Sequence, residues 1–152
     1  MLTIRPDDLT GSAVRALVAE HLAQMHATSP AESVHALAAD ALVGPGMRFF
    51  TAWDGAELLG MAALKELDPE RAEIKSMRTS AAGRGRGTGR ALLRHLVAEA
   101  AASGHRSLWL ETGVEDLFLP ARTLYGSEGF RPCPPFGDYV LDPHSVFMTR
   151  AL

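Results

Sequence analysis

The sequence has little of several features that mark particular classes of protein. It holds one cysteine, Cys133, so no internal disulfide can form. Prolines flank this cysteine and no histidine or aspartate is near it in sequence, which favours an inert, partly buried thiol over a nucleophile. No apolar stretch is long enough to span a bilayer, and the first residues lack the basic-then-apolar layout of a signal peptide. We therefore expect a cytoplasmic protein with no membrane partner.

Charge of one sign is not in large excess either. The formal net charge is −3, which argues against a general nucleic-acid-binding protein. The six histidines are scattered, and neither His21 nor His26 belongs to a His-Glu-x-x-His motif, so we expect no metal site. A length of 152 residues with 47% hydrophobic residues suits one domain, residues 1–152, with a sizeable core.

The most distinctive segment that is present is Arg84-Gly85-Arg86-Gly87-Thr88-Gly89-Arg90, which directly precedes an apolar stretch with helical spacing. Glycine weakens the start of a helix, and arginine is unfavourable beside the positive end of the helix dipole. Both costs disappear when an anion rests on the helix terminus between backbone N–H and guanidinium groups. We interpret the segment as a phosphate-binding loop; a flexible turn with solvated arginines is the alternative.

Three other known motifs fit this segment less well. A Walker loop needs a lysine after its last glycine, and none follows here. A dinucleotide fingerprint needs a third glycine where Arg90 stands. An arginine-glycine segment that binds nucleic acid is usually longer and repetitive. The pattern that remains is Arg-x-x-Gly-x-Gly, formed by Arg84, Gly87 and Gly89.

Hydrophobic periodicity predicts a mixed order of strands and helices around this loop. We expect strands at residues 2–5, 47–53, 57–65, 72–79, 106–112 and 145–150. We expect four helices: one capped by Thr10 or Ser12 that runs through Met25, one from Ser29 to about Leu42, one over Thr88–Ser103, and one over Leu119–Ser127. Asp54-Gly55 predicts a tight turn between the second and third strands. For the loop Phe136–Tyr139 we favour packing of its aromatic rings against the core, and lining of the acceptor pocket is the alternative.

Two motifs in this order resemble the GCN5-related N-acetyltransferase (GNAT) superfamily. The first is Arg84-x-x-Gly87-x-Gly89, and the second is Ala121-x-x-Leu124-Tyr125 followed by Gly129-Phe130. The resemblance implies an α/β (α+β) acyltransferase fold. In that fold an antiparallel N-terminal meander and a splayed parallel pair form one mixed sheet flanked by helices. It also implies acetyl-CoA as co-substrate, with no metal.

The resemblance further implies which residues form the site. The pyrophosphate of acetyl-CoA is expected on Arg84, Arg86, Arg90 and the backbone of Gly85, Gly87, Thr88 and Gly89. A bulge at Met77, Arg78 and Thr79 is expected to offer backbone groups to the pantetheine arm and the acetyl carbonyl. Glu73 is the leading candidate for the base, Glu111 is its rival, and many relatives use ordered water. Tyr125 is the candidate acid for the departing thiolate.

The expected activity is acetyl transfer to a primary amine of a small molecule or peptide, by direct attack in a ternary complex. The alternatives are a CoA-binding sensor without turnover and a nucleic-acid-binding protein. The sequence leaves open the acceptor and the oligomeric state, although homodimers are common in the superfamily. Phe118 stands where many relatives have asparagine, so the polar contact made by that asparagine is in doubt.

Overall fold

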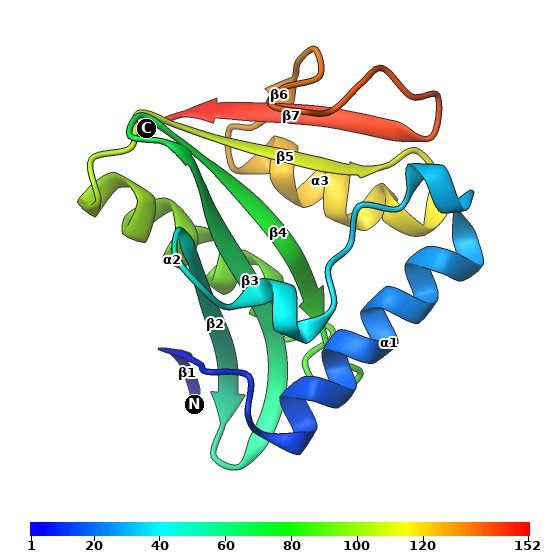
Figure 1. Cartoon of the computed structure of the whole chain (residues 1–152). Helices are drawn as coiled ribbons and strands as arrows, with labels where there is room; N and C mark the ends of the chain where they lie inside the picture. Colours follow the sequence, from blue (N-terminus) through cyan, green and yellow to red (C-terminus); the bar gives the residue numbers. More distant parts are fainter.

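The computed structural model describes residues 1–152 and contains a mixed sheet of seven strands with helices on both faces (Figure 1). The spatial order of the strands is β1-β2-β3-β4-β5-β7-β6. The strands are β1 (Leu2–Pro6), β2 (Met47–Asp54), β3 (Glu57–Asp68), β4 (Arg71–Thr79), β5 (Ser107–Gly113), β6 (Arg131–Pro132) and β7 (Ser145–Ala151). The first four form an antiparallel meander, and only β4 and β5 are parallel.

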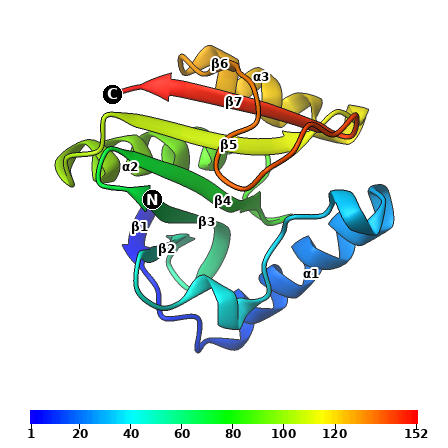
Figure 2. The same cartoon turned by 45° about the horizontal axis from the view of Figure 1, so that its top comes forward.

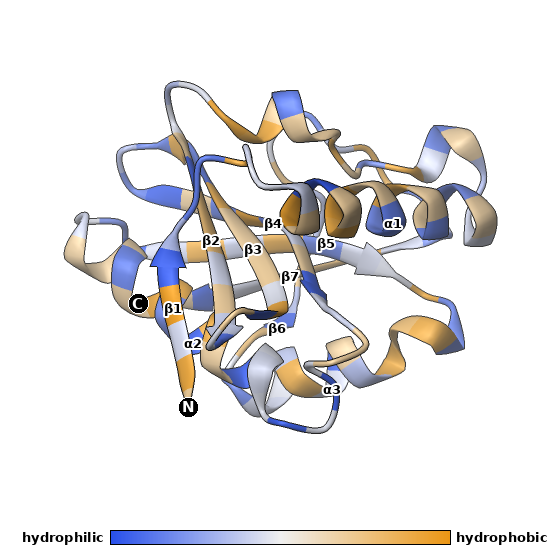
Figure 3. Ribbon diagram, turned by 90° about the horizontal axis from the view of Figure 1, so that it is seen from below, coloured by the Kyte–Doolittle hydropathy of each residue, from blue (hydrophilic) through white to orange (hydrophobic).

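Helices cover the two faces of the sheet unequally. The helices are α1 (Ser12–Thr28), α2 (Thr88–Ala102) and α3 (Leu119–Ser127), with three short 3-10 turns, η1 (Ala31–Ser33), η2 (Ala39–Leu42) and η3 (Asp116–Phe118). Figure 3 shows α1 on one face and both α2 and α3 on the other. None of these helices is both long and apolar enough to cross a membrane.

Each face of the sheet buries its own hydrophobic cluster. Because side chains alternate along a strand, β3 contributes to both clusters. Ala62 and Leu64 pack in the larger cluster with α2, whereas Met61 and Ala63 pack in the smaller cluster with α1. The run of buried residues along β3 therefore places this strand at the centre of the fold.

The sheet splits between its two parallel strands. β4 and β5 pair only from Arg71↔Ser107 to Ile74↔Leu110. Beyond that point β4 continues alongside β3 as far as Thr79, and β5 continues alongside β7 as far as Gly113. The two strand ends diverge in Figure 1, and Figure 2 shows the loop between β6 and β7 crossing β5 toward β4.

Most elements predicted from the sequence are confirmed. Helix α3 has the predicted bounds, and α2 and the strands agree to within a few residues. The turn after Asp54 is present, with Gly55 in the left-handed region at φ 58°. Cys133 is half-buried, and burial raises the pKa of its thiol, as expected for an inert cysteine.

Two predictions about the N-terminal third are wrong. The helix expected from Ser29 to Leu42 is absent; only η1 and η2 form, with extended chain between them. Buried Ser33 instead donates a hydrogen bond to Asp142, 2.6 Å away, and this contact with a distant loop outweighs the weak tendency of a short segment to form a helix. The N-cap of α1 is Gly11, because the hydroxyl of Thr10 donates to Asp8 instead.

Candidate active site

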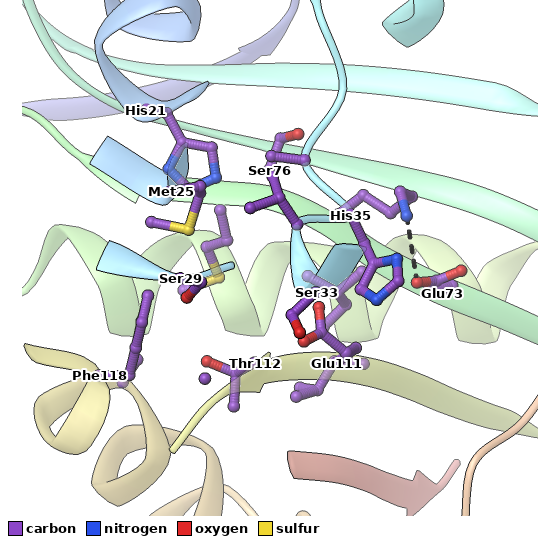
Figure 4. Close-up of a pocket in the computed structure, with 18 of the residues that line it drawn as sticks. His21, Met25, Ser29, Ser33, His35, Glu73, Ser76, Glu111, Thr112 and Phe118 are labelled. Atoms are coloured by element: carbon purple, nitrogen blue, oxygen red, sulfur yellow. Dashed lines mark hydrogen bonds and ion pairs between the residues drawn. The ribbon is translucent and has the colours of Figure 1, made fainter. Parts of the chain in front are cut away.

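A cleft opens where β4 and β5 diverge. Its walls come from both strands, from α1 and the extended segment after it, from η3 and α3, and from the loop before β7 (Figure 4). The polar side chains that line the cleft are His21, Ser29, Ser33, His35, Glu73, Lys75, Ser76, Glu111, Thr112, Tyr125, Tyr139 and His144. The cleft therefore brings Glu73, Glu111 and Tyr125, the three predicted catalytic residues, together with polar residues that the sequence motifs do not mark.

Glu73 lies on β4 and is almost fully buried, with 2% of its surface exposed. The phenolic hydroxyl of Tyr139 donates to its Oε2 at 2.5 Å, and the ammonium of Lys75 lies 3.4 Å from the same oxygen. Lys75 also donates to the Tyr139 oxygen at 3.0 Å. Glu73 thus lines the cleft as expected, but its carboxylate is already engaged by two side chains.

Glu111 lies near the end of β5 and is half-buried. Burial raises the pKa of its carboxyl to about 7, and the negative charge of Glu73 adds to this effect. The Lys75 ammonium acts in the opposite direction. A carboxyl group with this pKa is partly ionised at neutral pH and can exchange a proton with a substrate there.

Tyr125 projects from α3 into the cleft from the other face of the sheet. Its side chain is buried against Phe130, with ring centroids 5.9 Å apart. Burial, followed by the charge of Glu111, raises the pKa of the phenol to about 12. Tyr125 therefore keeps its proton at physiological pH and can act as a hydrogen-bond donor.

The bulge expected near the end of β4 is present. Between the pairs Ala63↔Lys75 and Met61↔Arg78, the two β4 residues Ser76 and Met77 oppose the single β3 residue Ala62. Ser76 occupies the bulge at φ 52°, in the left-handed region that a residue with a side chain seldom adopts. The buried Ser76 hydroxyl has no hydrogen-bond partner in the protein, so this stretch carries polar groups that a ligand can satisfy.

Side chains of the bulged stretch point in different directions. Met77 lines the cleft, whereas the Arg78 side chain is 10% exposed and its guanidinium donates to Glu20 at 3.0 Å and to Gln24, both on α1. Thr79 pairs with Gly60 at the end of the strand. The role predicted for Met77, Arg78 and Thr79 concerns their backbone groups, and it stays a prediction.

The glycine-rich loop approaches the sheet more closely than any other residue type would allow. A Cβ added at Gly83 would lie 2.0 Å from the carbonyl oxygen of Leu59. Gly85 and Gly87 have φ values of 71° and 76°, and Gly87 is the N-cap of α2. The buried Thr88 hydroxyl donates to the carbonyl of Gly83 at 3.0 Å and closes the loop. The α2 terminus has no side-chain cap and no acidic residue in its first turn, so its N–H groups suit an anion.

The three arginines predicted to bind phosphate differ in the ion pairs that they form. Arg86 forms ion pairs with Asp54 and, at 3.0 Å, with Glu57 of the β2–β3 hairpin. Arg90 pairs with Glu128, which also pairs with Arg94 at 3.1 Å. Arg84 is exposed and makes no ion pair or side-chain hydrogen bond. Within the predicted cluster, Arg84 is therefore the guanidinium that is free to meet a phosphate without breaking an existing contact.

Phe118, at the end of η3, forms part of the apolar wall of the cleft. Its ring packs so closely on Gly113 that a Cβ there would lie 2.3 Å from the ring. Arg122 fixes the same turn by donating to the carbonyls of Gly113 and Glu115 at 2.7 and 3.1 Å. An aromatic contact thus occupies the position whose polar contact the sequence put in doubt.

Several residues that line the cleft belong to no sequence motif. The Tyr139 ring packs on Phe136 and Phe147, as favoured for its loop, and its hydroxyl reaches Glu73 in the cleft, in line with the alternative. His21 and Lys75 were assigned no role at the site. They lie far apart in sequence and belong to no recognisable motif, so only the fold shows that they share one cleft.

A mixed sheet that splits between two parallel strands, beside a glycine-rich helix terminus, defines an acyl-CoA acyltransferase fold. The chain belongs to the acetyltransferase (GNAT) family, whose model matches residues 14–130. It is 52% identical to the uncharacterized N-acetyltransferase YsnE of Bacillus subtilis (strain 168), over 98% of this chain and 99% of that protein.

Solved structures show the same fold. A protein from Klebsiella pneumoniae assigned as an acyl-CoA N-acyltransferase superposes with a TM-score of 0.82 at 26% identity, over 100% of this chain and 98% of the other. A GNAT family acetyltransferase from Elizabethkingia anophelis with acetyl-CoA bound superposes with a TM-score of 0.71 at 18% identity, over 99% and 98% of the two chains. The fold predicted from the sequence is thereby confirmed.

Proposed function

We propose that the protein is an acetyl-CoA-dependent N-acetyltransferase that acetylates a primary amine by direct attack in a ternary complex. The observation that carries this proposal is the cleft between β4 and β5, which holds Glu111 on one side and Tyr125 on the other. The family membership and the acetyl-CoA bound to the Elizabethkingia anophelis protein support it.

The residues present fit acetyl-CoA. The uncapped N-terminus of α2, with Gly87 in the left-handed region, suits the pyrophosphate, and Arg84 is free to approach it. Backbone groups around the bulge at Ser76 suit the pantetheine arm, because the Ser76 hydroxyl and the diverging strand end have polar groups without partners. Acetyl-CoA supplies an activated acetyl thioester.

The acceptor amine must lose a proton to become a nucleophile. An alkyl amine has a pKa of about 10.4, so only about one molecule in a thousand is neutral at pH 7. We assign the base to Glu111, because its pKa of about 7 suits proton transfer at neutral pH. Glu73, the leading candidate from the sequence, has its carboxylate engaged by Tyr139 and Lys75, so we assign it the role of holding these two side chains.

The departing thiolate needs a proton or a hydrogen-bond donor. We assign this role to Tyr125, whose phenol stays protonated because its pKa is raised to about 12. Tyr125 follows Leu124, whose side chain lies close to Gly89 of the glycine-rich loop, and this proximity supports the role. The two proton-handling groups therefore come from opposite faces of the split sheet.

The proposal is tested by combining a binding measurement with a turnover measurement. Purified protein is titrated with acetyl-CoA in a calorimeter, and release of the CoA thiol is followed with a panel of primary amines. We expect binding, turnover with at least one amine, and loss of binding in Arg84→Glu. Arg106→Glu is the matched control, because Arg106 precedes β5 at the end away from the cleft and is 80% exposed.

The outcomes separate the proposal from its main rival. Binding of acetyl-CoA with no turnover on any amine would identify a CoA-binding sensor on the same fold. No binding at all, together with full tolerance of Arg84→Glu, would refute both functions. Glu111→Gln and Tyr125→Phe are expected to keep acetyl-CoA affinity while losing turnover.

A further inference from the structure

The cleft contains a lysine whose side chain is mostly buried. The chain has two lysines: Lys65 is exposed, whereas the Lys75 side chain is only 9% exposed. Removing an ammonium group from water is costly unless it gains partners. Its partners in the protein are the Tyr139 oxygen at 3.0 Å and Glu73 Oε2 at 3.4 Å.

These partners do not use the full capacity of the ammonium group. A lysine ammonium has three N–H donors, and two acceptors lie near this one. The Tyr139 hydroxyl donates its own proton to Glu73, so it is not available as a donor to a ligand. Lys75 lines the cleft, so its remaining donor is available to a ligand there. The negative charge of Glu73 offsets the positive charge of Lys75.

His35 adds a second donor beside Lys75. It lies on the extended segment between η1 and η2, with its ring edge-to-face against Tyr139 at a centroid distance of 4.9 Å. Burial and the charge of Lys75 lower the pKa of the imidazole, so His35 is neutral at pH 7 and carries one N–H. No side chain or backbone group of the protein forms a hydrogen bond with it, and it points into the cleft near Glu73 (Figure 4).

The register of the split sheet sets the distance between this pair of donors and Glu111. Lys75 and Glu111 are the first residues after the last paired positions, Ile74 and Leu110, so they occupy equivalent places on the same face. Neighbouring strands lie about 4.8 Å apart, and the gap widens where they diverge. A molecule that carries a carboxylate and an amine close together, as an α-amino acid does, is therefore suited to touch both side chains.

We propose that the acceptor is a free amino acid or a close analogue, whose carboxylate binds Lys75 and His35 while its amine faces Glu111. This inference rests on the proposed function, because it places the acceptor amine at Glu111. Lys75 is the specificity-determining residue, and Tyr139 and Glu73 position it. A peptide N-terminus, a polyamine or a simple alkyl amine has no carboxylate next to its amine, so it cannot form the contact with Lys75.

The test uses sets of acceptors that differ only in the carboxylate. L-phenylalanine is compared with L-phenylalaninamide and phenethylamine, and L-leucine with L-leucinamide and isoamylamine, by thiol release with acetyl-CoA. We expect kcat/KM to be at least tenfold higher for the amino acid in at least one set. The comparison is stringent, because the amine of an amino-acid amide is less basic and so is neutral more often.

Variants locate the effect at Lys75. Lys75→Met is expected to raise KM for the preferred amino acid at least tenfold and to remove the preference for the free acid over its amide. Lys65→Met, at the exposed lysine, is the matched control and should match the wild type. Acetyl-CoA affinity confirms that each variant is folded; if Lys75→Met does not fold, the comparison of acids and amides on the wild type decides the question.

The same experiments keep this inference apart from the proposed function. Turnover of amines with equal or lower efficiency for the free acids would overturn the inference and leave the acetyltransferase intact. If no amine is turned over, calorimetry with L-phenylalanine and L-leucine on CoA-saturated protein decides. Binding of an acid but not its amide would uphold the carboxylate site, and binding of neither acid would overturn it.

Discussion

The hydroxyl of Tyr139 lies 2.5 Å from the carboxylate of Glu73, although the two residues are 66 positions apart in the chain. Tyr139 belongs to the loop between β6 and β7, and Glu73 to the part of β4 that still pairs with β5. The contact ties the C-terminal loop to the floor of the cleft. It also engages the carboxylate that the sequence motifs mark as a base.

Tyr139→Phe removes the hydroxyl that links Glu73 and Lys75. We expect a loss of about 1–3 kcal/mol in the free energy of unfolding, because buried charged groups lose a hydrogen-bond partner. We also expect a higher KM for the acceptor with little change in acetyl-CoA affinity. Urea unfolding and steady-state kinetics measure the two effects. An unchanged acceptor KM would show that the network has no part in acceptor binding.

Glu111→Gln tests the assignment of the base. In the wild type, kcat/KM is expected to rise with pH through an apparent pKa near 7, the value to which burial raises this carboxyl. The variant should lose this limb and about 10²–10⁴-fold in rate, the usual contribution of a general base. The titration of the free amine, near pH 10, is well separated. Retention of the limb in Glu111→Gln and its loss in Glu73→Gln would return the role to Glu73.

The same carboxyl should leave a signature in stability. Its pKa rises from 4.5 to about 7 on folding, so between these pH values the native state holds a proton that the unfolded state has lost. Stability therefore falls as pH rises through this range, by at most about 3 kcal/mol. Glu111→Gln should remove this loss.

The contribution of Glu111 to the pH dependence of the unfolding free energy must be obtained as a difference between wild type and Glu111→Gln. Burial and the charge of Arg78 lower the pKa of His21 to about 4, so His21 contributes stability that increases as pH rises from 4 to 6.5. Subtracting the urea-unfolding free energies of Glu111→Gln from those of the wild type at each pH cancels this opposite trend. A difference that does not vary with pH would contradict the raised pKa of Glu111.

Gly83→Ala tests the close approach of the glycine-rich loop to β3. The new methyl group would lie 2.0 Å from the Leu59 carbonyl oxygen, so the loop must move away from the sheet. We expect a loss of about 1–3 kcal/mol in the free energy of unfolding and weaker acetyl-CoA binding. Gly126→Ala is the control, since no atom lies within 4 Å of a Cβ at this helical position and alanine favours a helix by up to about 1 kcal/mol. Equal stability of the two variants would refute the steric argument.

Sequence patterns predicted the elements whose stability is local. Helix α3 has the predicted bounds, and the strands of the meander follow from their apolar alternation and from the turn after Asp54. The glycine-rich loop was recognisable because Gly85 and Gly87 adopt φ values that other residues avoid. The segment after Ser29 was predicted incorrectly, because the contact between Ser33 and Asp142 overrides helix propensity.

The sequence by itself determined the family, the order of the elements and the place of the glycine-rich loop, because these depend on spacings within short segments. Only the tertiary structure decided which contacts the charged residues of the cleft make. Glu73 and Lys75 are both on β4, yet their partner Tyr139 comes from the C-terminal loop and His35 from the segment after α1. The pKa of Glu111 likewise depends on burial by chain segments far from it in sequence. Burial and ion pairing arise from contacts between distant segments, and no local pattern records them.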